Sequence, residues 1–450
     1  MTNRCLITKP SKRIFLIDMW SIFYLLVVYS LTIILDESNI FVFAIYLICA
    51  IPFINHLDRF ACICFLLSTM SYYFLGCSEG VWSIYTIFAY MMILRLFCER
   101  NLELPLRSCL YLIFMIVAVV LSYTHSEFGY IKGMYSMIYN IAIAMLVVIV
   151  IRFNQDTVSS YLPKLTVIQL MFYMVLLLIN GSYDGYGYSI SKDVNHNTFG
   201  ASIAILSGIL FIAIMFYHPK SNIYKLFWII SLILTFVSGS RNALLAIILT
   251  VIVIYIIVQK KQGKIISGWL KMLVIACSFL FLGGLVLPEL GVDLTRYNYV
   301  KLFNSGGSNR AIIWETLSPI IWKEHRWFGY GPSHFCSEQM IIKFMKLDYK
   351  HTHNTIFEAW GELGVFGLVP FILILVQAFK KAWSNIKMNN SNYLVISFLL
   401  FEFLLLSLGE SFFAKVELWI VIGLLLGCSQ SQNNLDAKYN KECFLNHNAN

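Results

Sequence analysis

Two histidines and an asparagine stand directly before a long apolar segment in the stretch HTHNTIFEAWGELGVFG, residues 351–367. Placing ionisable residues at the end of a membrane helix costs free energy, which suggests that they have a chemical role. Asn354 is placed to cap a helix that begins at about Thr355. The dipole of that helix disfavours a charged histidine beside its start, so His353 is expected to be neutral and able to accept a proton. A structural histidine at the membrane interface is the alternative.

A metal site is a second interpretation of the two histidines. His351 and His353 are two residues apart, so an extended chain would place both on one side. There they could chelate a metal together with His325 or His334. No carboxylate or cysteine joins them at the spacing of metal ligands, so the sequence predicts no metal site and no cofactor.

Two arginines stand beside small residues at the ends of apolar segments. Arg241 lies in SGSRNALLAIIL between two segments, and Arg310 lies in SGGSNRAIIW at the start of a helix-like piece. Small residues allow a close approach of an anionic group, and a guanidinium binds phosphate with two hydrogen bonds. A helix N-terminus adds free N–H groups that favour anions. We therefore predict anion binding at both arginines, with membrane snorkelling or an exposed loop position as the alternatives.

A polar and aromatic stretch, SYDGYGYSISKDVNHNTFG, leads into the apolar segment that begins near residue 199. Its aromatic rings could stack on sugars and its polar side chains could hydrogen-bond sugar hydroxyls. An ordinary turn-rich loop is the alternative. The candidates are Tyr186 and Tyr188 for stacking, and Asp184, Asp193, Asn195 and Asn197 for hydrogen bonding.

The composition excludes a soluble protein. Hydrophobic residues make up 59% of the 450 residues and charged residues only 13%, against roughly 25% charged in an average globular domain. The mean hydropathy is +0.73. Apolar runs of about 15 to 25 residues are helical in length, whereas a membrane barrel shows alternating segments of about ten. We predict an all-α, polytopic membrane helix bundle.

The apolar runs and the loop charges predict how the chain crosses the membrane. With the N-terminus inside, short inner segments hold 21 basic residues and short outer loops hold 4. The positive-inside rule therefore places both termini in the cytoplasm, and the net charge of +9 needs no nucleic-acid partner. The predicted spans, about 12 to 14, lie near residues 14–35, 40–56, 60–76, 81–97, 106–124, 134–151, 164–180, 199–217, 226–239, 243–258, 268–287, 355–379, 393–408 and 416–428.

One outer loop, residues 288–354, is far longer than the others. It contains NRAIIWETLSPIIWKEHRWF, whose apolar positions recur at helical spacing and whose tryptophans suit a membrane–water interface. We expect a short amphipathic helix on the outer leaflet, followed by a turn built on GYGPSHF.

The order of these motifs resembles the O-antigen ligase and O-antigen polymerase family of bacterial inner-membrane glycosyltransferases. The matching elements are DVNHNTFGA, SGSRNALLAI, NRAIIW with the downstream FGYGPSHF, and HTHNTIFEAWGELGVFGLVPF. Together they cover roughly residues 190–375. The resemblance implies an active site on the periplasmic face and an undecaprenyl-pyrophosphate-linked glycan as donor. It also implies transfer to an acceptor sugar hydroxyl without a metal or a nucleotide sugar.

The resemblance also implies roles for individual residues. Arg241 and Arg310 correspond to the arginines proposed to hold the donor pyrophosphate, and His353 corresponds to the proposed catalytic histidine. Fixed cations stabilise the charge that develops on the leaving pyrophosphate, and the attacking hydroxyl needs a base within reach. Asn354 is a further expected substrate contact. His351 falls outside the family pattern and is expected at most to help in substrate contact.

The acceptor decides between two enzymes of this family. A polymerase extends another lipid-linked repeat unit, and a ligase modifies lipid A-core. The divergent N-terminal half and the Lys-, Asn- and Ile-rich composition favour a polymerase of a surface-polysaccharide locus. Other polysaccharide-assembly membrane proteins are candidate partners besides the lipid bilayer. A transporter or flippase is the alternative of another class, although transporters place ionisable residues near the bilayer midplane.

Three regions are expected along the chain. Residues 1–180 form N-terminal transmembrane helices. Residues 181–430 form the ligase- or polymerase-like core, which includes the periplasmic loop 288–354 with its short helices. Residues 431–450, rich in Asn and Lys, are expected to be a disordered cytoplasmic tail.

Overall fold

The computed structural model describes residues 12–35, 40–70, 73–74, 83–98, 105–153, 156–185, 187–192, 194–261, 310–346 and 352–428. Several predictions from the sequence fall outside these residues. They concern Tyr186, Asp193, His351, the span at 268–287, the start of the long outer loop at 288–309 and the tail at 431–450.

Helices dominate the described residues, as predicted. In the first half they are α1 (Lys12–Ile34), α2 (Ile40–Ala50), α3 (Leu57–Ser68), α4 (Ile84–Cys98), α5 (Leu106–Thr124), α6 (Ile131–Val150), α7 (Leu162–Asn180) and α8 (His196–Ile212). In the second half they are α9 (Asn222–Val237), α10 (Arg241–Lys261), α13 (Arg310–Glu324), α14 (His334–Met345), α15 (Thr355–Met388), α16 (Leu394–Leu406) and α17 (Val416–Leu426). Short 3-10 or π turns at Ile51–Asn55, Thr157–Tyr161 and Ala213–Tyr217 adjoin α2, α7 and α8.

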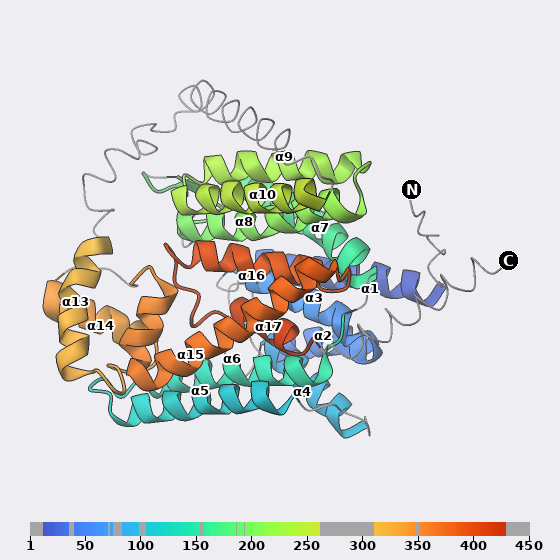
Figure 1. The fold of residues 1–450 in the computed structure, drawn as a ribbon. Helices are drawn as coiled ribbons and strands as arrows, with labels where there is room; N and C mark the ends of the chain where they lie inside the picture. The colour runs from blue at the N-terminus through green and yellow to red at the C-terminus, as the bar shows by residue number, and fades with distance from the viewer. Residues whose placement is uncertain are drawn as a thin grey trace.

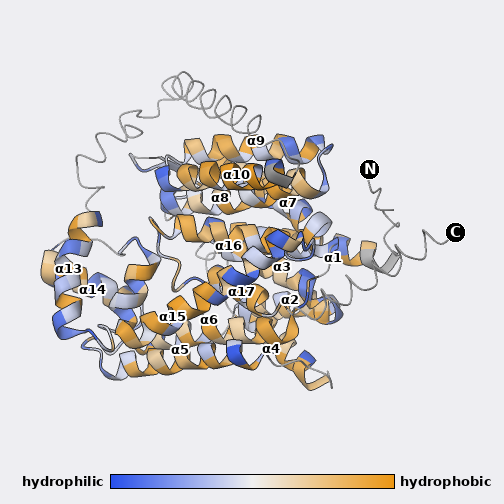
Figure 2. Ribbon diagram, viewed as in Figure 1, coloured by the Kyte–Doolittle hydropathy of each residue, from blue (hydrophilic) through white to orange (hydrophobic). Residues whose placement is uncertain are grey.

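The helices form a bundle whose surface is apolar. Among the described residues, seven helices are long and apolar enough to cross a membrane, and five shorter apolar helices accompany them. Hydrophobic residues run along the bundle helices in Figure 2. Outward-facing side chains such as Phe114 (58% exposed) and Leu178 (86% exposed) are large and apolar. Such faces are stable against lipid chains and not against water, which confirms the predicted polytopic membrane bundle.

Two predicted spans differ from the helices observed. The span expected at 60–76 ends at Ser68, so α3 has 12 residues and is short for a bilayer of about 30 Å. The span expected at 355–379 extends to Met388 as α15. Gly364 interrupts this helix with φ 63° and ψ −162°, a conformation that glycine adopts without strain from a side chain.

Two glycine-containing motifs pair through their backbones at this kink. The Tyr330 N–H donates to the Gly361 carbonyl (2.9 Å) and the Val365 N–H donates to the Arg326 carbonyl (2.8 Å). A Cβ on Gly364 would lie 2.4 Å from the Trp327 carbonyl carbon, so only glycine allows this approach. The segment between α13 and α14 is therefore fixed against α15.

The predicted outer helix exists as α13, and the centre of its apolar stripe packs against protein. Ile313, Leu317 and Ile321 are fully buried in a small core with α14. That core lies beyond one end of the bundle, at the left of Figure 1. Trp322 and Trp327 remain exposed (55% and 51%), as does Ile312 of the predicted stripe (47%), and these side chains are available to an interface. Helical spacing identified the stripe and could not identify the partner that covers it.

Candidate functional site

The start of α15 is held by its own capping residue and by two neighbouring segments. The Asn354 side chain caps the helix, since its Oδ1 accepts from the Phe357 N–H (2.9 Å); this confirms the predicted cap. The Thr352 carbonyl accepts from Trp314 Nε1 of α13 (2.8 Å). The Thr355 hydroxyl donates to the Glu410 carbonyl (3.0 Å) in the loop between α16 and α17.

His353 lies between these anchors in a left-handed conformation with φ 56°, which histidine adopts more readily than most residues. Its side chain is partly buried. Burial, together with the nearby Arg310 guanidinium, lowers its pKa to about 4. The imidazole is therefore neutral at neutral pH, as the sequence predicted, but burial and Arg310 are the causes and not the helix dipole alone.

Arg310 is the first residue of α13 and points toward the same place. Its Nη2 lies 3.9 Å from Glu410 Oε1, and the Glu410 side chain is only 10% exposed. Burial raises the pKa of Glu410, while Arg310 and Lys415 act in the opposite direction. Arg310 thus contributes a positive charge beside a neutral histidine and a largely buried carboxyl group.

Gly409 lets α10 approach this cluster. A Cβ at Gly409 would lie 2.7 Å from Asn242 Cγ and 2.8 Å from Arg310 Nη1. Both side chains therefore meet over this glycine. Arg241 directly precedes Asn242 as the first residue of α10. The structure thus brings together the SGSRNALLAI, NRAIIW and HTHN motifs, which are far apart in the sequence.

Substitution of Gly409 by alanine is expected to reduce glycan transfer by roughly tenfold or more while the protein stays folded. The three atoms nearest to the new Cβ all belong to the side chains of Asn242 and Arg310. The Cβ should push the Arg310 guanidinium aside without shifting the backbone. Transfer by purified protein and its melting temperature are the measurements. Leu408→Ala, at a neighbouring position that is 63% exposed, is the control, and equal activity of the two variants contradicts this role of Gly409.

The stretch before α8 lies against the turn that precedes Arg241. It forms a short antiparallel hairpin, β1 (Ser182–Tyr183) and β2 (Tyr188–Ser189). A Cβ at Gly187 would lie 1.9 Å from the Ser238 carbonyl oxygen, so the two segments touch. Tyr183 and Tyr188 form an exposed ring pair with centroids 5.1 Å apart.

The polar residues of this stretch have structural partners. Asn195 caps α8 by accepting from the Asn197 N–H (2.7 Å). The Asp184 carboxylate pairs with His196 Nδ1 at 2.5 Å. Sugar contact by Asn195 and Asn197 stays a prediction, and Tyr186 lies outside the described residues.

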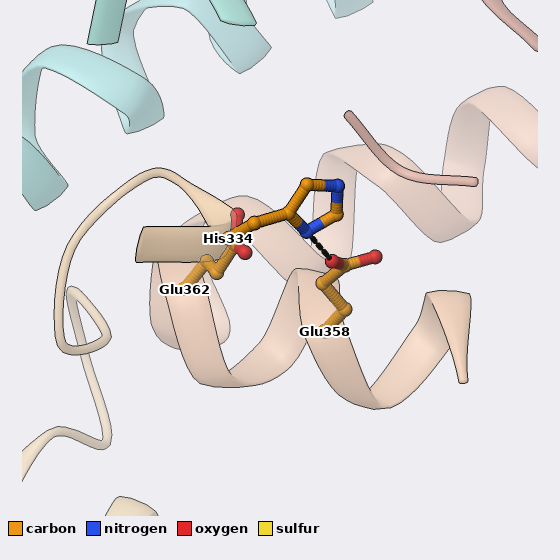
Figure 3. A group of neighbouring side chains, drawn as sticks. All are labelled: His334, Glu358 and Glu362. Atoms are coloured by element: carbon orange, nitrogen blue, oxygen red, sulfur yellow. Dashed lines mark ion pairs between the residues drawn. The ribbon is translucent and has the colours of Figure 1, made fainter. Parts of the chain in front are cut away.

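A second polar cluster lies between α14 and α15 (Figure 3). His334 Nδ1 is 2.5 Å from Glu358 Oε1, and Ser337 Oγ donates to Glu362 Oε1 (3.0 Å). One donor atom from each of His334, Glu358 and Glu362 lies within 4.8 Å of the others. Burial disfavours the charged His334, but the Glu358 carboxylate outweighs it and raises the pKa of His334 to about 9. This set of donors could hold a metal ion.

Sequence reasoning missed Glu410, Asn242 and both members of the Glu358 and Glu362 pair. Glu358 and Glu362 are four residues apart inside a predicted helix, which places them on one face. That spacing was the available signal. Glu410 lies between two apolar segments beside Gly409, and nothing in its local sequence links it to Arg310.

Comparison with known protein families bears directly on the cluster formed by Arg310, His353 and the start of α10. Residues 226–372 match the family model described as O-antigen ligase. For these residues the match bears out the predicted similarity to the O-antigen ligase and polymerase family. The O-antigen ligase match begins inside α9, ends inside α15 and includes Arg241, Arg310 and His353. A comparison with curated proteins finds no significant match. The apolar helices make the chain a multi-pass membrane protein, and the similarity of residues 226–372 to the O-antigen ligase family supports a glycosyl-transfer enzyme.

Proposed function

We propose that the protein transfers a glycan from undecaprenyl pyrophosphate to an acceptor sugar hydroxyl at the periplasmic face of a bacterial inner membrane. The observation that carries the proposal is the meeting of Arg310, His353 and the start of α10 at one place. A guanidinium beside a neutral imidazole suits a reaction that expels a phosphate and deprotonates a hydroxyl.

In this mechanism the acceptor oxygen attacks the anomeric carbon of the donor. The bond from that carbon to the pyrophosphate oxygen breaks, and the leaving undecaprenyl pyrophosphate keeps the electron pair. Arg310 and Arg241 stabilise the negative charge that develops on it without a metal ion. His353 takes the proton of the attacking hydroxyl. A direct displacement of this kind inverts the anomeric centre.

Asn354 and the hairpin region are proposed to position the sugars. The exposed Tyr183 and Tyr188 rings lie on a hairpin that touches the turn before Arg241, and aromatic rings offer flat apolar faces to sugar rings. Asn195 and Asn197 offer amide groups at the start of α8. The basic residues in short loops support cytoplasmic termini and a periplasmic site.

We favour an O-antigen polymerase, in which the acceptor is a second lipid-linked repeat unit. The N-terminal half lies outside the O-antigen ligase match at residues 226–372, and this divergence, together with the Lys-, Asn- and Ile-rich composition, supports the choice of a polymerase. The description of the matched family favours the second candidate, a ligase that joins the glycan to lipid A-core.

A deletion strain separates these candidates by its lipopolysaccharide pattern on a gel. We expect core bearing a single repeat unit, because repeat units would still be ligated but not polymerised. Polymerised chains that remain on undecaprenyl pyrophosphate would identify a ligase instead. A normal surface glycan contradicts both activities. Restoration by a plasmid copy of the wild type controls for effects on neighbouring genes.

A further inference from the structure

We propose that His334, Glu358 and Glu362 bind one divalent transition-metal ion, of which Zn²⁺ is the best representative, and that this ion fastens α14 to the start of α15. None of these three residues has a role in the proposed reaction, and the ion takes no part in that chemistry. The proposal therefore goes beyond the proposed function and is tested without donor or acceptor.

The positions of the three side chains follow from two features of the fold. Glu358 and Glu362 are four residues apart on α15, so both project from one face of the helix. The backbone pairing of the Gly329 region with Gly361 and Glu362 brings α14 against that face. His334, at the start of α14, directs its ring at the Glu358 carboxyl group, and the Glu362 carboxyl group lies beside the same side chain (Figure 3). One donor atom of each lies within 4.8 Å of the others.

Two carboxylate oxygens in this cluster lack a hydrogen-bond partner among the described residues. Glu358 Oε2 and Glu362 Oε2 are both buried without one, and both side chains have no exposed surface. Ser337 satisfies only Glu362 Oε1. Buried carboxylate oxygens are costly unless they are paired, hydrogen-bonded or bound to a metal. These two oxygens therefore point to a ligand.

Charge balance favours a divalent cation as that ligand. Two carboxyl groups that share a buried place, as Glu358 and Glu362 do, cannot both carry a charge unless positive charge lies between them. A divalent ion offsets both. The imidazole nitrogen and the carboxylate oxygens bind the ion, and any proton that these three side chains hold at those atoms leaves to solvent.

The donor types favour zinc over magnesium or calcium. Zn²⁺ accepts histidine nitrogen and carboxylate oxygen together, whereas Mg²⁺ and Ca²⁺ prefer oxygen donors alone. Zinc binds such donors at about 2.1 Å, which separates neighbouring donors by about 3.4 Å in a tetrahedral site. The 2.5 Å contact of His334 with Glu358 must open by less than about 1 Å, a shift that side-chain rotation supplies.

Metal binding to the purified full-length chain in lipid nanodiscs tests the proposal. After treatment with a chelator, titration with Zn²⁺ should show one equivalent bound, measured by calorimetry and by elemental analysis. Saturating zinc should raise the melting temperature by about 5 °C. Glu362→Gln and His334→Asn should each abolish the bound equivalent and the shift. Mn²⁺ should compete with zinc more effectively than Mg²⁺.

The matched control is His325→Asn, which alters another largely buried histidine, whose Nε2 lies 3.8 Å from Glu127 Oε1 and which is no member of the proposed set of ligands. This variant should keep the zinc equivalent. Wild-type protein that binds no zinc would overturn the proposal, as would Glu362→Gln protein that binds zinc like the wild type. If Glu362→Gln fails to fold, the test depends on two other results. Glu358→Gln should lose the bound zinc, and the wild type should bind one zinc ion per chain. Glycan transfer that persists in protein without zinc leaves the proposed function standing.

Discussion

Arg310→Ala is expected to reduce glycan transfer by about 10²- to 10³-fold, which is the effect of removing one positioned group that stabilises developing negative charge. Arg310 is the guanidinium that lies beside both His353 and Glu410. Its loss leaves the developing charge on the leaving pyrophosphate without its nearest cation. The rate constant of the chemical step should fall more than the apparent affinity for the donor, because that charge is largest in the transition state.

Two further variants distinguish this role from a role in folding. Lys323→Ala removes an exposed cation from the same helix, α13, and should transfer at nearly the wild-type rate. Arg310→Lys keeps the positive charge beside Glu410. It loses the two parallel hydrogen bonds that a guanidinium donates to a phosphate, so its activity should be intermediate. Purified proteins with matched melting temperatures and a lipid-linked donor provide the measurement. Near-normal glycan transfer by Arg310→Ala would contradict the assignment of Arg310 to the proposed site.

The features that the sequence predicted well depend on local patterns. Continuous apolar runs indicate spanning helices because the bilayer imposes their length. The cap at Asn354 was predicted because capping involves only the next three residues. The neutral state of His353 was predicted for an incomplete reason, since burial and Arg310 were invisible in the sequence.

The features that the sequence could not show depend on contacts between distant segments. The meeting of Arg310 with Asn242 depends on Gly409, which is about 100 residues further along the chain. The proposed metal cluster joins His334 to Glu358 through the glycine pairing at the α15 kink, which no periodicity reveals. The stripe of α13 had helical spacing, but a stripe of this kind fits lipid and a protein partner equally well.

His353→Gln is expected to reduce transfer by about 10²- to 10⁴-fold, the contribution of a positioned general base. Glutamine retains a polar group of similar reach but accepts no proton at neutral pH. The rate constant of the chemical step should fall while donor affinity changes little. His125→Gln, at an exposed histidine between α5 and α6, is the control and should behave like the wild type. A His353→Gln enzyme with near-normal transfer contradicts its assignment as the base.

The pH profile tests His353 independently of any substitution. Burial and Arg310 hold its pKa at about 4, below the unperturbed value of about 6.5. A base is active when it is deprotonated, so kcat/KM should be flat from pH 8 to about pH 5 and fall only near pH 4. Donor pyrophosphate bound at Arg310 offsets the charge that helps to lower the pKa. The acid limb of kcat, which reports the donor complex, should therefore lie at higher pH than that of kcat/KM. Coincident limbs, or a limb of kcat/KM near pH 6.5, contradict the contact of His353 with Arg310 on which the proposed site depends.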